Sequence, residues 1–292
     1  MRFSVREIRR RAAVSGAHGT VRRLAPVGFA VALVLVQIAY PLTSGDARDR
    51  VTVAVVLLSA GTALAHATAT RGIRYAAGVL VVVSGLGLAA EVVGTATGVP
   101  FGCYDYAVDR LGPALSGVPL VVPLAWTGGL YPIWVVAGLL SRRALSRIGL
   151  TAVGAVGWDL FLDPQMVADG QWTWCDTDSG LPGLPEIPVT NYLGWFTVAL
   201  LMGTLLTVLD RAVPASVGLD IPPNPSAGLD KVSAISVPVA VFLWTWLGSA
   251  LAHAVFLGLP ISACYGGVGL AVLGLPLLRH LRFSRPRPER AG

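Results

Sequence analysis

The chain is poor in several residue types that particular functions require. Charged residues make up 13% of its 292 residues, against about 25% in a soluble domain, so most of the chain is expected inside a membrane. The four histidines are not close to one another in sequence, which argues against the histidine clusters that hold iron in membrane oxygenases and desaturases. The only lysine, Lys231, lies at the mouth of an expected helix, which argues against a retinal pigment.

Cysteines and cofactor motifs are scarce as well. Cys103 and Cys175 both fall in expected loops on one side of the membrane, where they can pair or stay apart, and Cys264 lies within the last helix. Residues 85–90 mimic a dinucleotide-binding fingerprint, but they lie inside an unbroken apolar helix, where small residues serve close helix packing. No soluble basic module is present. We therefore expect no cofactor, no metal and no nucleic-acid partner.

Hydrophobic residues are abundant and make up 54% of the chain. A helix needs about 20 apolar residues to cross a membrane core of ~30 Å. Eight segments qualify: residues 25–42, 51–69, 74–99, 118–140, 148–163, 190–213, 232–257 and 259–278. The sequence therefore predicts an all-α fold, a polytopic transmembrane helix bundle of about eight helices.

Positive charge predicts the orientation of this bundle, because loops rich in Lys and Arg stay in the cytoplasm. With eight helices and the N-terminus inside, nineteen of the 22 Lys and Arg residues face the cytoplasm, and only Arg48, Arg50 and Arg110 face outward. A seven-helix bundle puts the five arginines of the C-terminal tail outside. The N- and C-termini are thus expected to be cytoplasmic. We expect a basic arm (1–24), a single transmembrane domain (25–279) and an Arg/Pro-rich tail (280–292), in the plasma membrane.

One stretch of the chain is acidic and has no positive charge. The last Lys or Arg before residue 190 is Arg147, and the acidic residues in the stretch between are Asp159, Asp163, Asp169, Asp176, Asp178 and Glu186. Ionisable groups at membrane depth are costly and are candidates for function. Asp159 lies 12 residues from Arg147, or ~18 Å of helical rise. Asp163 follows one turn later on the same helix face.

Three further polar residues are expected at a similar depth: Glu91, Asn191 and His253. Each candidate also has a structural interpretation. Asp163 precedes Pro164 and can simply end its helix at the water interface, Glu91 can be an interfacial residue, and His253 can be a hydrogen-bonded packing residue. Trp172 and Trp174 fit either an interfacial aromatic belt or a lid. The remaining acidic residues, Asp169, Asp176, Asp178 and Glu186, are expected to be solvated loop charges.

The paired carboxyl groups predict acid chemistry. Two carboxyl groups in one apolar site cannot both ionise easily, so one keeps its proton, and a neutral carboxylic acid can protonate a weak base such as an alkene. Aromatic faces, for example those of Tyr104, Trp126 and Trp195, stabilise a carbocation. Asp159 is the deeper of the pair and is our candidate for the proton donor.

Residues 91–200 carry a series of short motifs in a fixed order. These are Gly102-Cys-Tyr104-Asp-Tyr106, Leu111-Gly-Pro113, Gly117-Val-Pro119-Leu with Pro123 and Trp126, Asp159-Leu-Phe-Leu-Asp163-Pro164, Gly170-Gln-Trp172-Thr-Trp174, Ile187-Pro188 and Asn191-Tyr-Leu-Gly194-Trp195-Phe196. In these motifs the chain resembles the membrane-integral carotenoid 1,2-hydratases. The resemblance covers a little over a third of the chain, and the first two and last two helices lie outside it.

The resemblance implies a reaction without a cofactor, in which water adds across the terminal C1–C2 double bond of an acyclic carotenoid. On this hypothesis the catalytic residues are Asp159, Asp163, Glu91 and Asn191. The substrate-binding residues are Tyr104, Tyr106, Trp126, Trp172, Trp174, Tyr192, Trp195 and His253. The expected partners are a carotenoid taken from the lipid phase, membrane lipid, and neighbouring enzymes of the same pathway.

Two alternatives from other classes stay open. A transferase or cyclase of the same pathway would use a metal-bound diphosphate and needs paired Asp residues that face the cytoplasm, whereas the pair here is expected to face outward. A non-catalytic carotenoid-binding or transport protein would share the apolar site, but it has no need of two buried carboxylates.

Overall fold

The computed structural model describes residues 24–176, 178–213 and 227–283, in the last range with side chains from Ser236 onward. Eight helices in these residues are long and apolar enough to cross a membrane. They are the first helix (Leu24–Leu42), α2 (Gly45–Arg71), α3 (Ile73–Thr97), α4 (Val121–Leu140), α5 (Ala144–Ala168), α6 (Val189–Ala212), α7 (Ala227–Leu251) and α8 (Pro260–Phe283). The predicted all-α, polytopic bundle is confirmed, and the chain is a multi-pass membrane protein.

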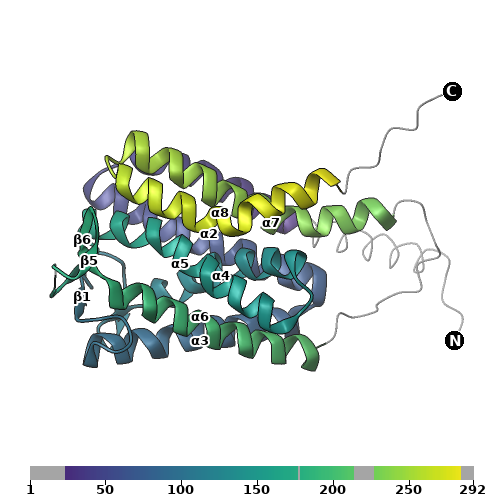
Figure 1. The fold of residues 1–292 in the computed structure, drawn as a ribbon, viewed down its shortest axis with the longest axis horizontal. Helices are drawn as coiled ribbons and strands as arrows, with labels where there is room; N and C mark the ends of the chain where they lie inside the picture. The colour runs from purple at the N-terminus through teal and green to yellow at the C-terminus, as the bar shows by residue number, and fades with distance from the viewer. Residues whose placement is uncertain (1–23, 177, 214–226, 284–292) are drawn as a thin grey trace, which may run out of the picture.

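The helices run side by side, with α4 and α5 in the middle of the bundle (Figure 1). In the most apolar window of each helix, 61% of α4 and 50% of α5 is buried, against 17% of the first helix. Small residues bring helices together, as the sequence predicted. A Cβ on Gly157 of α5 would lie 2.7 Å from the carbonyl carbon of Gly269 on α8, and one on Gly87 would lie 2.9 Å from the Trp126 ring.

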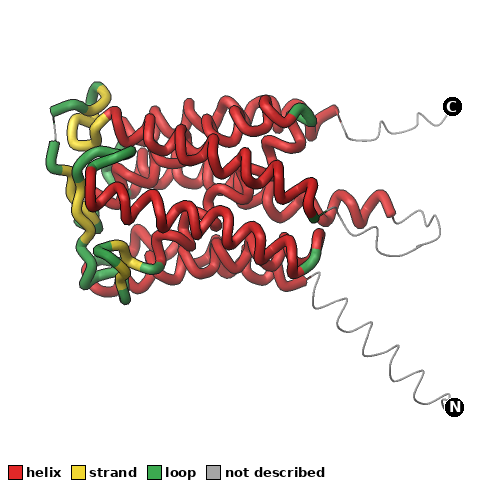
Figure 2. The backbone as a smooth tube through the Cα atoms, turned by 90° about the horizontal axis from the view of Figure 1, so that it is seen from below, coloured by secondary structure: helices red, strands yellow, loops and turns green. Residues whose placement is uncertain are grey.

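All strands of the described chain lie at one end of the bundle, which we call the strand end (Figure 2). They form three two-stranded antiparallel sheets. The pairs are β1 (Tyr104–Tyr106) with β4 (Trp172–Trp174), β2 (Ala114–Leu115) with β3 (Val118–Pro119), and β5 (Gly180–Leu181) with β6 (Leu184–Pro188). The sequence predicted loops without strands here, so these sheets are an addition to the expected fold.

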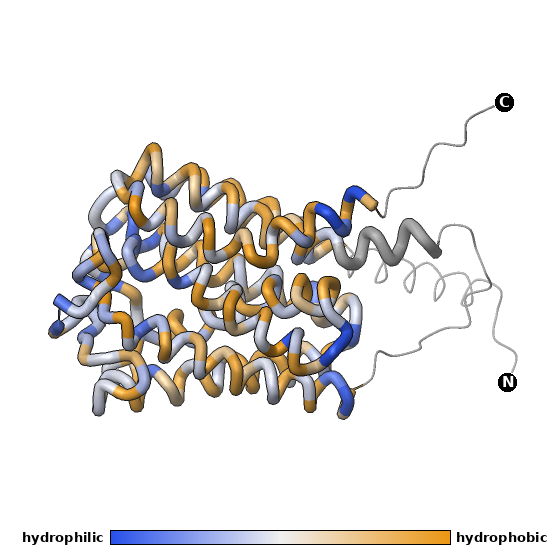
Figure 3. The backbone as a smooth tube through the Cα atoms, in the orientation of Figure 1, coloured by the Kyte–Doolittle hydropathy of each residue, from blue (hydrophilic) through white to orange (hydrophobic). Residues whose placement is uncertain are grey.

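The opposite end, which we call the arginine end, carries the cluster of Arg71, Arg147 and Asp210. Hydrophobic residues dominate the helices between the two ends, and hydrophilic residues gather mainly toward them (Figure 3). Because the first helix ends and α8 begins at the strand end, the described chain starts and finishes at the arginine end. The assignment of this end to the cytoplasm stays a prediction. Residues 1–23 and 284–292 of the expected arm and tail lie outside the described residues.

The predicted end of the fifth helix at Asp163 is wrong, because α5 continues through Pro164 to Ala168. A proline inside a helix has no N–H for the carbonyl four residues earlier, which here is that of Leu160. The hydroxyl of Ser262 on α8 donates to this carbonyl oxygen at 2.7 Å. A neighbouring helix thus satisfies the freed backbone group, as membrane proteins require, and Asp163 stays inside the helix.

Helices α7 and α8 form the predicted hairpin. The π-helix η2 (Ala252–Phe256) follows α7 directly, and Gly258 makes the turn with a φ of 70°, in the left-handed region that favours glycine. The last residues of the first helix form the 3-10 turn η1 (Tyr40–Leu42). Both irregular segments lie at the strand end and border the cavity described next.

Candidate active site

A cavity of about 450 Å³ lies inside the bundle and reaches the strand end. Four polar residues from three helices line it: Glu91 of α3, Asp159 and Asp163 of α5, and Asn191 of α6. Their side chains are at most 5% exposed. The structure therefore brings together the four residues that the sequence nominated for catalysis.

Asn191 joins the two aspartates. Its side-chain amide donates to Asp159 Oδ2 at 2.8 Å and to Asp163 Oδ2 at 2.6 Å. One amide therefore bridges the two carboxyl groups, which lie one helical turn apart on the same face of α5. The interfacial interpretation of Asp163 is wrong, because its side chain is 1% exposed.

Glu91 has three hydrogen-bond donors of its own. Tyr104 and Tyr106 donate their hydroxyls to Oε2 at 2.5 and 2.8 Å, and Trp126 Nε1 donates to Oε1 at 2.9 Å. The interfacial interpretation of Glu91 is therefore also wrong. Both of its oxygens are occupied by neutral donors that stabilise the ionised carboxylate.

The sheet of β1 and β4 supplies most of these donors. Tyr104 pairs with Trp174 and Tyr106 with Trp172 in the antiparallel register, so the four rings share one face of the sheet. That face covers the cavity: the two tyrosines bond Glu91, and Trp172 and Trp174 donate to Asp163 Oδ1 at 2.5 and 3.3 Å. The lid interpretation of Trp172 and Trp174 thus fits better than an aromatic belt.

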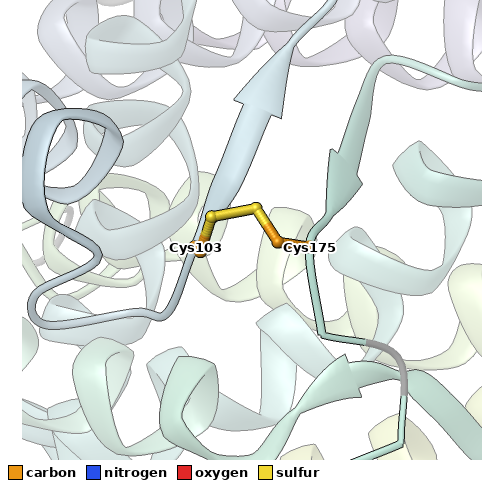
Figure 4. Close-up of a disulfide and its surroundings, with 2 residues drawn as sticks. All are labelled: Cys103 and Cys175. Carbon is orange, nitrogen blue, oxygen red and sulfur yellow. A yellow bond between two sulfur atoms is a disulfide. The ribbon is translucent and has the colours of Figure 1, made fainter.

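A disulfide closes this sheet. Cys103 directly precedes β1 and Cys175 directly follows β4, and their sulfur atoms are bonded (Figure 4). The backbone N–H of Cys175 also donates to the carbonyl oxygen of Cys103 at 2.9 Å. The sequence left open whether these cysteines pair, and the structure shows that they do. The disulfide ties together the two strands whose side chains donate hydrogen bonds to Glu91 and Asp163. Cys264 is free and exposed.

The two tyrosine hydroxyls keep their protons. Burial, and after it the nearby carboxylate of Glu91, raises the pKa of Tyr104 and Tyr106 well above the usual value for tyrosine. Both side chains therefore act as hydrogen-bond donors over the whole ordinary pH range. They hold Glu91 in place and do not exchange protons with it.

Aromatic faces form a further wall of the cavity. The rings of Trp126 and Trp195 are stacked with their centroids 3.8 Å apart, and Trp158 meets Trp195 edge to face at 5.5 Å. All three residues line the cavity. Aromatic faces attract cations, so this wall can stabilise positive charge that develops beside the carboxylates.

His253 lies in η2 and lines the cavity, but both of its ring nitrogens have partners. Nδ1 is 2.9 Å from Ser262 Oγ, and Nε2 is 3.1 Å from Gln165 Oε1. His253 is fully buried. Its contacts fit the packing interpretation, while its place in the wall keeps a substrate-binding role as a prediction.

Tyr192 is the one nominated residue that does not line the cavity. Its neighbour Asn191 and Trp195, one turn later, face the cavity from α6, and Tyr192 is rotated away from them around the helix. Its ring is buried in the main hydrophobic core.

The sequence did not reveal a polar network beside the site. Asp169 accepts hydrogen bonds from Tyr40 and from Arg48, the latter at 2.7 Å, so its expected place in solvent is wrong. Arg110 pairs with Asp49 at 2.7 Å, and Asp49 also accepts from Gln171 at 2.7 Å. These contacts tie the first helix and α2 to the loops at the strand end. Asp176, Asp178 and Glu186 are exposed, as expected.

A signal for the aromatic sheet was present in the sequence. Tyr-x-Tyr and Trp-x-Trp both alternate with the period of a strand. A cysteine lies just before the first motif and just after the second, which is the arrangement of an antiparallel pair closed by a disulfide. Reading the two motifs as paired strands would have predicted both the sheet and the disulfide.

The fold and the site together define a polytopic membrane protein with a group of buried carboxylates in an aromatic-lined cavity. The model of the family described as "Carotenoid biosynthesis protein" matches residues 51–273. Since this is well over half of the chain, the protein belongs to that family. All eight helices except the first lie wholly or partly within the matched region.

A curated relative is also similar in sequence. The bisanhydrobacterioruberin hydratase of Haloarcula japonica is 36% identical over 124 residues, which are 41% of this chain and 39% of the relative. The alignment thus spans about two-fifths of the relative's length. No solved structure matches the chain.

Proposed function

We propose that the protein is a carotenoid-modifying enzyme that adds water across the terminal C1–C2 double bond of acyclic carotenoids by acid catalysis. Membership of the carotenoid biosynthesis family supports the substrate class. The similarity to a protein named as a hydratase supports the reaction type. The buried carboxylates support the mechanism.

One observation carries the proposal: among the residues that the structure describes, a single carboxylate oxygen of the site has no hydrogen-bond partner. Glu91 and Asp163 have donors on both oxygens, and Asp159 Oδ2 has Asn191. Asp159 Oδ1 is buried and has none among the described residues. A buried carboxylate oxygen without a donor is costly when charged, so this oxygen is the place for a proton in the cavity.

The reaction uses this proton. Asp159 gives it to C2 of the terminal double bond, which breaks the π bond and leaves a tertiary cation at C1. A water molecule forms the C1–O bond and loses a proton, which returns to Asp159 directly or by way of Asp163 and so restores the acid. The product is a tertiary alcohol, and no electrons are exchanged with any other molecule.

The surroundings favour the cation. In this mechanism the carboxylate form of Glu91, held by Tyr104, Tyr106 and Trp126, supplies negative charge, and the stacked faces of Trp126 and Trp195 supply π density. Groups that are already oriented stabilise developing charge without reorganisation. Asn191, which bridges both aspartates, positions the donor and the group that accepts the proton from water.

The substrate comes from the lipid phase in this proposal, because an acyclic carotenoid is as apolar as the cavity wall. The protein then works in the plasma membrane among lipids and beside other enzymes of the same pathway. It needs no metal, flavin or nucleotide, since proton transfer and water addition balance without them.

Expression in a host that produces lycopene tests the proposal. Without oxygen, the pigment should gain the mass of one water for each reacted end, and water labelled with a heavy oxygen isotope should pass its label to the product. Incorporation of label from molecular oxygen would point to an oxygenase. Retention of lycopene without any product would favour the carotenoid-binding or transport alternative, and a cyclised or prenylated product would favour the cyclase or the transferase.

A further inference from the structure

The cavity extends beyond the carboxylates into a second part, which we call the chain arm. Its walls come from the first helix (Leu33, Gln37), from α2 (Val55) and from α7 (Val241, Trp244, Gly248). The same cavity contains the site with Asp159 and Glu91, so the two parts are continuous. The chain arm is therefore an extension of the proposed active site.

Chemically, the chain arm differs from the site. The Asp and Glu residues that line the cavity are Glu91, Asp159 and Asp163, all at the site, and the cavity lining contains no Lys or Arg of the described chain. Apolar and uncharged polar side chains make up the arm. Such a wall suits a hydrocarbon chain without charged groups.

The arm also reaches the lipid-facing surface. Ile38 and Leu42 of the first helix, Leu251 at the end of α7 and Phe256 at the end of η2 line the cavity, yet they are between 51% and 79% exposed. The first helix is the least buried of the eight spans, with 17% of its window buried. The cavity thus opens sideways between the first helix and α7.

A hydrogen bond joins the two helices at this opening. Trp244 Nε1 donates to Gln37 Oε1 at 2.9 Å, and both residues line the arm. Beside this bond, Leu33 packs with Val237 and Val241 in a small apolar cluster. The contacts described at the lateral opening are one hydrogen bond and an apolar cluster, so a lipid-soluble molecule that passes there meets mainly apolar side chains.

We propose that the chain arm binds the polyene chain that follows the reacting end, and that this chain enters from the lipid between the first helix and α7. The inference rests on the proposed function for the identity of the chain. A cavity of about 450 Å³ is in the range of sites for drug-sized ligands, roughly 300–1,000 Å³. A forty-carbon carotenoid is larger than such a ligand, so its far end stays in the lipid.

Gly248 decides how wide the arm is. A Cβ at this position would lie 3.3 Å from two atoms of the Trp244 ring, so a larger side chain must move that ring or fill the arm. Val55 faces the arm from the opposite side, on α2. Bulky residues at either position are expected to exclude the chain while leaving the carboxylates untouched.

The test measures chain binding apart from catalysis. Asp159→Asn protein is purified from lycopene-producing cells, and the total acyclic carotenoid retained per protein is measured. Gly248→Leu and Val55→Phe, each added to Asp159→Asn, should lower it about tenfold, because overpacking a filled site is strongly unfavourable. Gly85→Leu is the matched control, since Gly85 is exposed on α3 and a Cβ there meets nothing within 4 Å. Yield and monodispersity verify folding.

Unchanged carotenoid retention in both arm variants would overturn the proposal, and so would an equal loss in Gly85→Leu. A second measurement uses the otherwise wild-type enzyme with two substrates, lycopene and the short isoprenoid geranylacetone, which has the same end group. Gly248→Leu should lose lycopene conversion and keep that of geranylacetone; equal loss of both would contradict a chain-binding role. If the wild type hydrates neither substrate while retention still depends on Gly248, the proposed function fails and the chain arm stands.

Discussion

Both ends of the bundle hold carboxylates, partly buried at one end and fully buried at the other, and surround them with different partners. At the arginine end, Asp210 accepts hydrogen bonds from Arg71, from Arg147 at 2.7 Å and from Tyr75 at 2.7 Å. At the strand end, the partners of Glu91, Asp159 and Asp163 are indole N–H groups, phenol hydroxyls and one amide. None of these donors carries a charge.

In the proposed function, this difference separates a structural carboxylate from the candidate catalytic ones. Two guanidinium groups form ion pairs with Asp210, and the cluster ties α2, α3, α5 and α6 together. Neutral donors hold a carboxyl group in position without neutralising it, so the group can exist in either protonation state. The charged pairs of the strand end, Arg48–Asp169 and Arg110–Asp49, are formed by other carboxylates. Within the described part of the chain, the carboxylates of the cavity have no cationic partner.

The largest expected effect is at Asp159. Asp159→Asn keeps the shape and the hydrogen-bonding capacity of the side chain but removes the acid, so turnover of lycopene should fall by ~10²-fold or more. Pigment analysis of membranes at matched protein levels measures it. Asp176→Asn, at an exposed loop position, is the control and should stay close to wild type. Near-normal turnover in Asp159→Asn would remove Asp159 from the mechanism.

Glu91→Gln should have the next largest effect. The substitution removes the fixed negative charge beside the cation and disturbs the three donors of Glu91, so turnover should fall by about 10- to 100-fold. The same pigment assay measures it. If Glu91→Gln abolishes turnover while Asp159→Asn does not, Glu91 is the proton donor.

Loss of the disulfide should have a smaller effect, because it acts through the sheet. Replacing both Cys103 and Cys175 by serine should lower unfolding stability by about 2–4 kcal/mol. It should also lower turnover by about fivefold, since β1 and β4 position the donors to Glu91 and Asp163. Thermal unfolding and the pigment assay measure the two effects. Cys264→Ser, at a free and exposed thiol on α8, is the control for serine replacement.

Asp210→Asn should lower the stability of the protein and leave its turnover almost unchanged. Breaking a buried ion pair costs about 3–5 kcal/mol, and the cost should be lower here because the Asp210 side chain is 19% exposed. The apparent melting temperature should therefore fall, while turnover per folded protein stays within about twofold of wild type. A loss of turnover as large as that of Asp159→Asn would show that the two ends do not differ as described.

The last prediction assigns the two ends to the two sides of the membrane. Asp178→Cys places a thiol in the exposed loop of the strand end, and a membrane-impermeant reagent should label it in intact cells without changing turnover. The Cys103–Cys175 disulfide agrees with an oxidising environment at this end. Labelling only after permeabilisation would reverse the predicted orientation.

Local sequence properties were sufficient for much of the fold. Length and hydropathy of the apolar segments predicted eight spans, because each span satisfies its own backbone hydrogen bonds and buries its own side chains in lipid. Helical periodicity placed Asp159 and Asp163 on one face. The ends of the helices were predicted less reliably. The fifth helix does not end before Pro164 as expected, because the hydroxyl of Ser262 on α8, far away in sequence, donates to the backbone carbonyl that the proline leaves without a partner.

What only the tertiary structure decided is which partner each carboxylate has. Asn191, Trp172, Tyr104 and Trp126 reach their carboxylates from other helices or from paired strands, and such pairings depend on register and helix packing. Asp169 shows why the sequence did not predict these partners. Its neighbours in the sequence are those of a solvated loop, but Arg48 and Tyr40, far away in the sequence, donate hydrogen bonds to it. The sequence alone thus determined the spans and the candidate acids, because hydropathy and helical period are local. The structure decided which acids pair with arginine and which have neutral partners, because such pairings are made between distant segments.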